Sequence, residues 1–174
     1  LFFLTKKNWR ISCKALLAML YYDNNCVHDS YVSVSSCAGS GLFDMQQANR
    51  VGMQTVLATD VGAGTSFSLL RTMGEAYKVQ QLGGYPMSVF ESLYKCTLGA
   101  AKALHLDDEI GCFGEGRKAD FIVIDYAVIP SQQVRMDYLK HHEKWTLENK
   151  LFGLQTIGDD RNILATYIVG RRMK

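Results

Sequence analysis

The stretch VLATDVGAGTSF, residues 56–67, carries a run of apolar and small residues into a carboxylate, Asp60. A glycine-rich turn follows, and then a helical pattern begins. An acid at the C-terminal end of a buried parallel strand lies where α/β proteins place their chemistry. Asp60 is therefore a candidate metal ligand or proton carrier. The alternative is that Asp60 only caps the turn or the next helix, which its spacing alone favours.

The turn after Asp60 contains Gly62 and Gly64, a G-x-G pattern between an expected strand and an expected helix. Such a turn is typical of dinucleotide-binding loops, in which backbone N–H groups at a helix start hold phosphate. The third glycine of that pattern is missing, because Phe67 stands at its position. A sharp turn that brings backbone close to another group is the interpretation we prefer, and a small nucleotide-binding α/β module is the alternative.

The four histidines do not form a metal-binding pattern by spacing, since neither H-x-H nor H-x-x-x-H occurs. A zinc site needs three or four ligands. We expect His141 and His142 on a solvated face and His105 at a helix end, where partial positive charge is favourable. His28 follows Cys26 in the run CVH, with no partner pair nearby.

The elements that would position Asp60 alternate between strand and helix, which predicts an α/β fold. Strands are expected at 30–36, 52–60, 121–125 and 162–170. Helices are expected at 11–22, 42–49, 66–82 and 89–104, and parts of 132–155. In the helix expected at 66–82, the inward-facing residues should be Phe67, Leu70, Met73, Tyr77 and Val79. Ser88 and Glu91 should form a capping box at the start of the next one.

Composition limits the classes of function. The chain of 174 residues is 48% hydrophobic, 21% charged and carries a net charge of +2, which fits one globular domain with a real core. Without clustered Lys and Arg we expect no nucleic-acid partner. No run reaches the ~20 apolar residues of a membrane span. The five scattered cysteines indicate free thiols in a reducing compartment, the cytoplasm.

Longer segments of the sequence resemble a known family. Residues 39–174 are similar to the C-terminal part of guanine deaminases of the amidohydrolase superfamily. The matching runs are GSGLFD at 39–44, ATDVGAGTSFSLLRTMGEAYKVQQL at 58–82, LYKCTLGAAKALHLDDEIGCFGEGRKADFIVID at 93–125 and IGDDRNILATYIVGR at 157–171. The resemblance implies the C-terminal portion of a (β/α)₈ TIM-like barrel with part of a small β-sandwich domain.

The resemblance also implies a reaction and a cofactor. Members of this family hydrolyse guanine to xanthine and ammonia with one zinc ion. Asp60 matches the family's aspartate at the end of barrel strand eight, which ligates the zinc and carries a proton. The implied partners are therefore guanine as substrate and zinc as metal, and the implied assembly is a homodimer. We expect residues 1–115 to be a partial barrel and residues 116–174 to belong to the small β-domain.

The sequence departs from the family at its other metal ligands. The run NNCVHD at 24–29 aligns with the family's AHC-x-H, which puts Asn25 at the ligand position and His28 at the non-ligating histidine. The family's H-x-H pair, its third histidine and its PTSNLFL segment have no match, and the chain begins without Met. We therefore expect part of a longer enzyme with little or no activity alone. The alternative is a catalytically silent interaction partner of a full-length deaminase.

Overall fold

The computed structural model describes residues 28–29, 42–59 and 66–173. Asp60, Gly62 and Gly64, the expected helix at 11–22 and the expected strand at 30–36 lie outside these residues. Strands β1 (His28–Asp29) and β2 (Thr55–Val56) form a parallel pair. Strands β3 (Phe121–Ile124), β4 (Ile163–Ile168) and β5 (Arg171–Arg172) form an antiparallel sheet in the order β3-β4-β5. The α/β expectation therefore holds.

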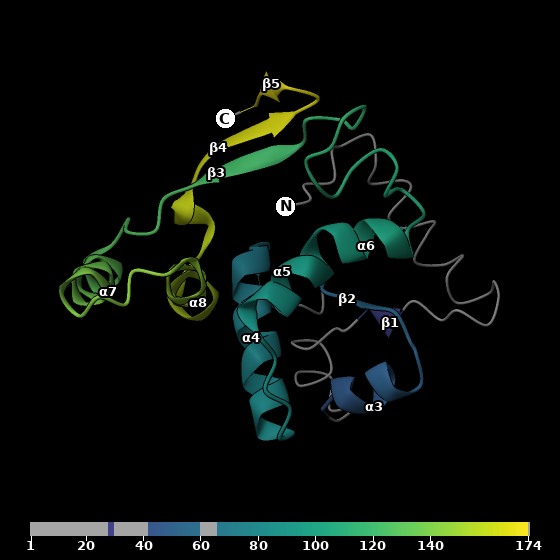
Figure 1. Ribbon diagram of the computed structural model, residues 1–174, viewed down its shortest axis with the longest axis horizontal. Helices are drawn as coiled ribbons and strands as arrows, with labels where there is room; N and C mark the ends of the chain where they lie inside the picture. The colour runs from purple at the N-terminus through teal and green to yellow at the C-terminus, as the bar shows by residue number, and fades with distance from the viewer. Residues whose placement is uncertain (1–27, 30–41, 60–65, 174) are drawn as a thin grey trace.

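The helices of the first part of the chain surround the parallel pair (Figure 1). They are α3 (Met45–Arg50), α4 (Leu69–Leu82), α5 (Val89–Cys96) and α6 (Leu98–Ala103). Helix α3 begins after its N-cap, Asp44, whose carboxylate accepts a hydrogen bond from the Gln47 N–H at 2.8 Å. These starts and ends lie close to the predicted ranges, because capping residues and glycines mark them in the sequence.

Two later helices lie in the chain between β3 and β4 of the antiparallel sheet. Helix α7 (Pro130–His141) begins with proline, and α8 (Leu147–Ile157) begins after Thr146, whose hydroxyl accepts a hydrogen bond from the Asn149 N–H at 3.2 Å. Figure 1 shows α8 between α7 and α4, and α8 contacts both helices. A short 3₁₀ turn at Asp160–Asn162 leads from α8 into β4.

The hydrophobic core lies between α4, α5 and α8. It is built mainly from aliphatic and sulfur-containing side chains: Met45, Leu57, Leu70, Met73, Ala76, Val79, Met87, Val89, Cys96 and Leu154. Burial of such side chains supplies the main driving force for folding. Burial also raises the pKa of the Cys96 thiol to about 12, so this cysteine is a packing residue.

Four details differ from the predictions. The strand predicted at 52–60 consists of only Thr55 and Val56. The single helix predicted at 89–104 is two helices, because Thr97 leaves helical geometry with φ −129° and ψ −105°. Phe67 is 77% exposed and does not face the core, because α4 begins only after Ser68. The capping box at α5 is half formed: Ser88 accepts from the Glu91 N–H at 3.1 Å, but the Glu91 carboxylate binds Tyr85.

Candidate functional site

The structure describes the residues on both sides of the site that the sequence predicts at Asp60. Strand β2 ends at Val56, residues 57–59 continue toward Asp60, and the described chain resumes at Ser66. The parallel pairing places His28 opposite Thr55 and Asp29 opposite Val56. The carboxyl ends of β1 and β2 therefore lie at one edge, which is where parallel sheets carry functional groups.

Helix α5 holds β2 from one side through Lys95. The Lys95 ammonium group donates a hydrogen bond to the Thr55 hydroxyl at 2.5 Å, and the Leu57 N–H donates to the Lys95 carbonyl at 3.2 Å. Lys95 is only 6% exposed. Burial lowers the pKa of Lys95, and the nearby Glu91 carboxylate opposes that shift. The strand is thus attached to a helix by a buried, polar contact.

The charge of Lys95 faces a short chain of polar groups. Glu91 Oε1 lies 3.7 Å from the Lys95 ammonium nitrogen. The Tyr85 hydroxyl donates to Glu91 Oε2 at 2.9 Å, and Asn49 Nδ2 donates to the Tyr85 hydroxyl oxygen at 3.1 Å. Burial and the Glu91 contact raise the pKa of Tyr85. This chain connects α5 to the end of α3 and gives the buried ammonium group a counter-charge.

A polar hollow of about 270 Å³ lies between α4 and the segment from α8 to the 3₁₀ turn. Ser66, the first described residue after 60–65, lies at its edge. Charged side chains from both sides line it, among them Arg71, Glu75, Lys78, Asp159 and Arg161. A more apolar hollow of about 390 Å³, lined by Phe67, Leu70 and Ile163 among others, also borders Ser66. Both hollows therefore adjoin the chain that follows Asp60.

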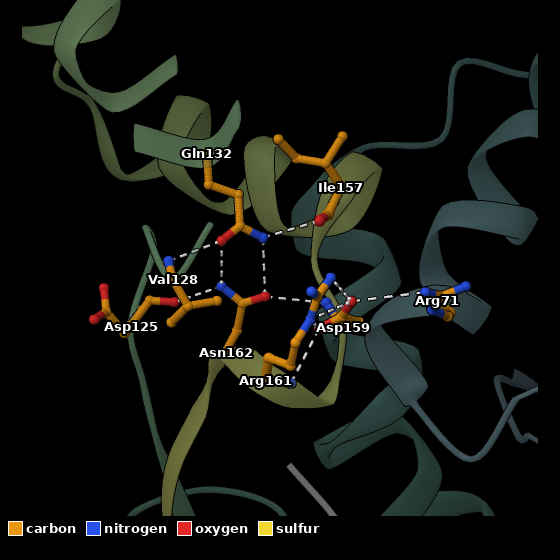
Figure 2. A network of polar contacts seen from close by, with 8 residues as sticks. All are labelled: Arg71, Asp125, Val128, Gln132, Ile157, Asp159, Arg161 and Asn162. Carbon is orange, nitrogen blue, oxygen red and sulfur yellow. Dashed lines mark hydrogen bonds and ion pairs between the residues drawn. The ribbon is translucent and has the colours of Figure 1, made fainter. Parts of the chain in front are cut away.

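In the polar hollow, the Asp159 carboxylate lies beside two arginine side chains (Figure 2). Arg161 donates to its carboxylate through Nη2 at 2.6 Å and Nε at 3.0 Å, and Arg71 Nη2 lies 3.6 Å away. The hydrogen bonds from Arg161, more than the charge of Arg71, hold the pKa of Asp159 at about 2. Asp159 is therefore ionised and neutralised, and it ties α4 to the C-terminal segment.

Behind Asp159, two buried amides complete the network that Figure 2 shows. Asn162 donates to the Asp125 carbonyl at 2.7 Å and accepts from the Asp159 N–H at 3.0 Å. Gln132 donates to the Ile157 carbonyl at 2.9 Å and accepts from the Val128 N–H at 3.0 Å. The network fixes the turn between α8 and β4 and has the satisfied contacts of a structural element.

The described residues do not make a zinc site by themselves. Within 28–29, 42–59 and 66–173, no three His, Cys, Asp or Glu side chains form a group that could hold a metal ion. His105 follows Leu104, the C-cap residue of α6, and His141 and His142 are exposed at the end of α7, as predicted. Nor is any helix in the described part of the chain long and apolar enough to cross a membrane.

Comparison with known proteins identifies the family. The model of the amidohydrolase family matches residues 7–173. This chain belongs to the amidohydrolase family. The guanine deaminase of Escherichia coli (strain K12) is 47% identical to it over 133 residues, which are 76% of this chain and 29% of the E. coli protein. The amidohydrolase chain therefore spans less than a third of the length of this relative.

Solved structures agree with the fold. The amidohydrolase chain matches E. coli guanine deaminase with a TM-score of 0.76 and 44% identity, over 82% of this chain and 32% of that one. It matches C. acetobutylicum guanine deaminase with bound guanine at a TM-score of 0.62 and 26% identity, over 84% and 33%. A Xanthomonas campestris adenosine deaminase with bound zinc, 19% identical with a TM-score of 0.65 over 84% and 31%, agrees in fold alone. The predicted fold, a portion of a TIM-type barrel, is thus confirmed.

Sequence reasoning missed Lys95, Asp159 and Gln132. A signal for Lys95 was present, because Glu91 and Lys95 are spaced i,i+4 on one helix. The contact with Thr55, forty residues earlier in the sequence, has no local signal. Asp159 stands in the run GDDR, where an acid followed by arginine two residues later permits the pair that forms. The partner of Gln132 lies in another segment and cannot be read from spacing.

Proposed function

We propose that this chain takes part in the hydrolytic deamination of guanine to xanthine and ammonia, as a guanine deaminase-like member of the amidohydrolase family. The observation that carries the proposal is the 47% identity to E. coli guanine deaminase over 133 residues. Bound guanine in the C. acetobutylicum relative supports guanine as the substrate. A cytoplasmic location and a homodimer are further parts of the proposal.

Asp60 is the residue that we propose for the chemistry. Its role would be to ligate a zinc ion and to carry a proton from the attacking water to the departing amine. The parallel pair β1·β2 supports this role, since β2 runs toward Asp60 and ends four residues before it. Zinc in the X. campestris adenosine deaminase supports the metal. Among the described residues no group of three or more His, Cys, Asp or Glu side chains could hold a metal ion, so the proposal assigns no further ligand.

The direct test is to incubate the purified chain with guanine and zinc and to follow xanthine and ammonia. We expect no turnover, or very little, because Asn25 stands at the position of a ligand histidine. A chimera tests competence more sharply: the 133 matched residues of this chain replace their counterparts in the E. coli enzyme. We expect xanthine formation by the chimera and its loss in the Asp60→Ala chimera. An inactive but folded chimera would contradict the proposal.

The alternative is a catalytically silent partner of a full-length deaminase. Large exposed apolar side chains favour it, among them Phe67 at 77% and Phe113 at 81%. Co-purification with an intact homologue would support this role, and a well-behaved monomer that captures no homologue would count against it. The nucleotide-binding module is not proposed further, because the family match includes Gly62 and Gly64.

A further inference from the structure

Lys95 contacts β2 and the residue that follows the strand, on either side of Val56. Its ammonium group donates to the Thr55 hydroxyl at 2.5 Å, and its carbonyl accepts from the Leu57 N–H at 3.2 Å. One residue of α5 therefore holds both the side chain that precedes Val56 and the main chain that follows it. Contacts of this kind fix a strand along its own axis as well as sideways.

The other described neighbours of the strand are β1 and helix α6. Strand β2 consists of two residues, and its pairing with β1 consists of the two positions His28↔Thr55 and Asp29↔Val56. A ladder of two positions supplies few backbone hydrogen bonds to hold the strand. The contacts from Lys95 are directional, and they add to the packing on α6 in determining where the chain leaves β2 toward Asp60.

Stability alone gives a poor account of this lysine. A buried ammonium group loses its hydration, and the lowered pKa of Lys95 records that cost. An apolar side chain of similar length would fill the same space without it. A directional N–H···O contact does what an apolar side chain cannot, because it fixes one geometry.

We propose that Lys95 is a positioning residue for the carboxyl end of β2, which acts through the Thr55 hydroxyl to hold the segment that leads into Asp60. The purpose of this positioning rests on the function proposed above, whereas the positioning itself is a property of the folded chain. Glu91, held by Tyr85, supplies the counter-charge that keeps the ammonium group in place.

Amide hydrogen exchange of the full chain tests the proposal, without guanine or metal in the sample. The Leu57 amide reports on β2, and the Met73 amide in the core of α4 reports on opening of the whole fold. In Thr55→Val and in Lys95→Met, the Leu57 exchange rate should rise about 10-fold or more relative to that of Met73, as expected for loss of a buried, charge-assisted hydrogen bond. Thr55→Ser keeps the hydroxyl and should restore the ratio of the unaltered chain.

Lys102→Met on the neighbouring helix α6 is the matched control, because Lys102 is exposed. It should leave the Leu57 to Met73 ratio unchanged. Equal acceleration of both amides in Thr55→Val would overturn the proposal, since that is the effect of a merely stabilising contact. If Lys95→Met does not fold, Thr55→Val still decides, because it retains the lysine. Failure of the deamination assay would not change the interpretation of the exchange rates. Unchanged Leu57 exchange in the variants of an active protein would refute the positioning role of Lys95 and leave the proposed function standing.

Discussion

The side-chain amides of Gln132 and Asn162 form a reciprocal pair of hydrogen bonds, each 3.0 Å long, from Gln132 Nε2 to Asn162 Oδ1 and from Asn162 Nδ2 to Gln132 Oε1. Gln132 is 2% exposed and Asn162 is fully buried. The pair joins the first turn of α7 to the 3₁₀ turn before β4, so both elements depend on it.

Gln132→Ala should destabilise the chain by about 2–4 kcal/mol, because it leaves buried polar groups of Asn162 without partners. Urea unfolding followed by circular dichroism measures the loss. Gln133→Ala is the matched control: Gln133 is the next residue of α7 and its side chain is exposed, with a single contact to Asp137. It should change stability by less than about 0.5 kcal/mol. Equal losses in both variants would contradict the structural role of the pair.

Asp159 should make the chain sensitive to acid. Its pKa of about 2 in the folded state lies below its ordinary value of 3.8. Its ionised form therefore adds stability that is fully present above about pH 4 and is lost as the pH falls toward 2. Allowing for solvent screening, the contribution is about 1–2 kcal/mol. The Asp159→Asn variant should lose this amount at pH 6 and little at pH 2, by urea unfolding at each pH. The same profile for the exposed neighbour, Asp160→Asn, would refute the assignment.

Gly74 lies where α4 meets α8. A Cβ atom at this position would stand 2.5 Å from the Gln155 carbonyl oxygen, which is main chain and cannot swing aside. Gly74→Ala should therefore destabilise the chain by about 2 kcal/mol or more, although alanine is intrinsically the better helix former. Gly83→Ala at the end of the same helix has no contact closer than 3.5 Å and should be near neutral. Thermal unfolding of the two variants compares them, and a stabilised Gly74→Ala would show that the helices are farther apart.

Lys95 should give the chain a stability that rises with alkaline pH. Its folded-state pKa is lowered by burial, so the unfolded chain binds more protons between that pKa and 10.5, and stability increases with pH over this window. Lys95→Met should remove the increase. Because Tyr85 and Cys96, with raised pKa values, act in the opposite direction, the difference between variant and unaltered chain is the quantity to measure. If the curves of stability against pH for Lys95→Met and for the unaltered chain run parallel, the effect is disproved. The curve of the control variant Lys102→Met should run parallel to that of the unaltered chain.

The sequence predicts well those elements that local signals mark. Helix α4 follows from its apolar spacing and ends where Gly83 and Gly84 interrupt it, and β3 follows from the apolar run at 121–124. The break between α5 and α6 was not predictable in the same way. The apolar pattern continues through Thr97, and only the packing of the two helices shows that the chain must turn there.

The residues of the candidate site are likewise predictable only where a local signal marks them. Asp60 stood out because a carboxylate at a strand end has a local signature. The contacts that hold β2 did not, since Lys95 meets Thr55 only after folding, and a lysine in a helix is ordinarily read as solvated. Glu91 gives the clearest contrast: its spacing from Ser88 predicts a capping box, yet the tertiary contact with Tyr85 takes its carboxylate instead.

Gln155 of α8 donates from Nε2 to the Met73 carbonyl, 82 residues earlier, and to the Ser92 hydroxyl, 63 residues earlier. Contacts between such distant positions form late, because the intervening chain must first be closed into a loop. During synthesis, α4 and α5 emerge from the ribosome well before α8, which contributes Leu154 to the core. The part of the core between these three helices can therefore close only after α8 has emerged, and chaperone demand should fall at that stage.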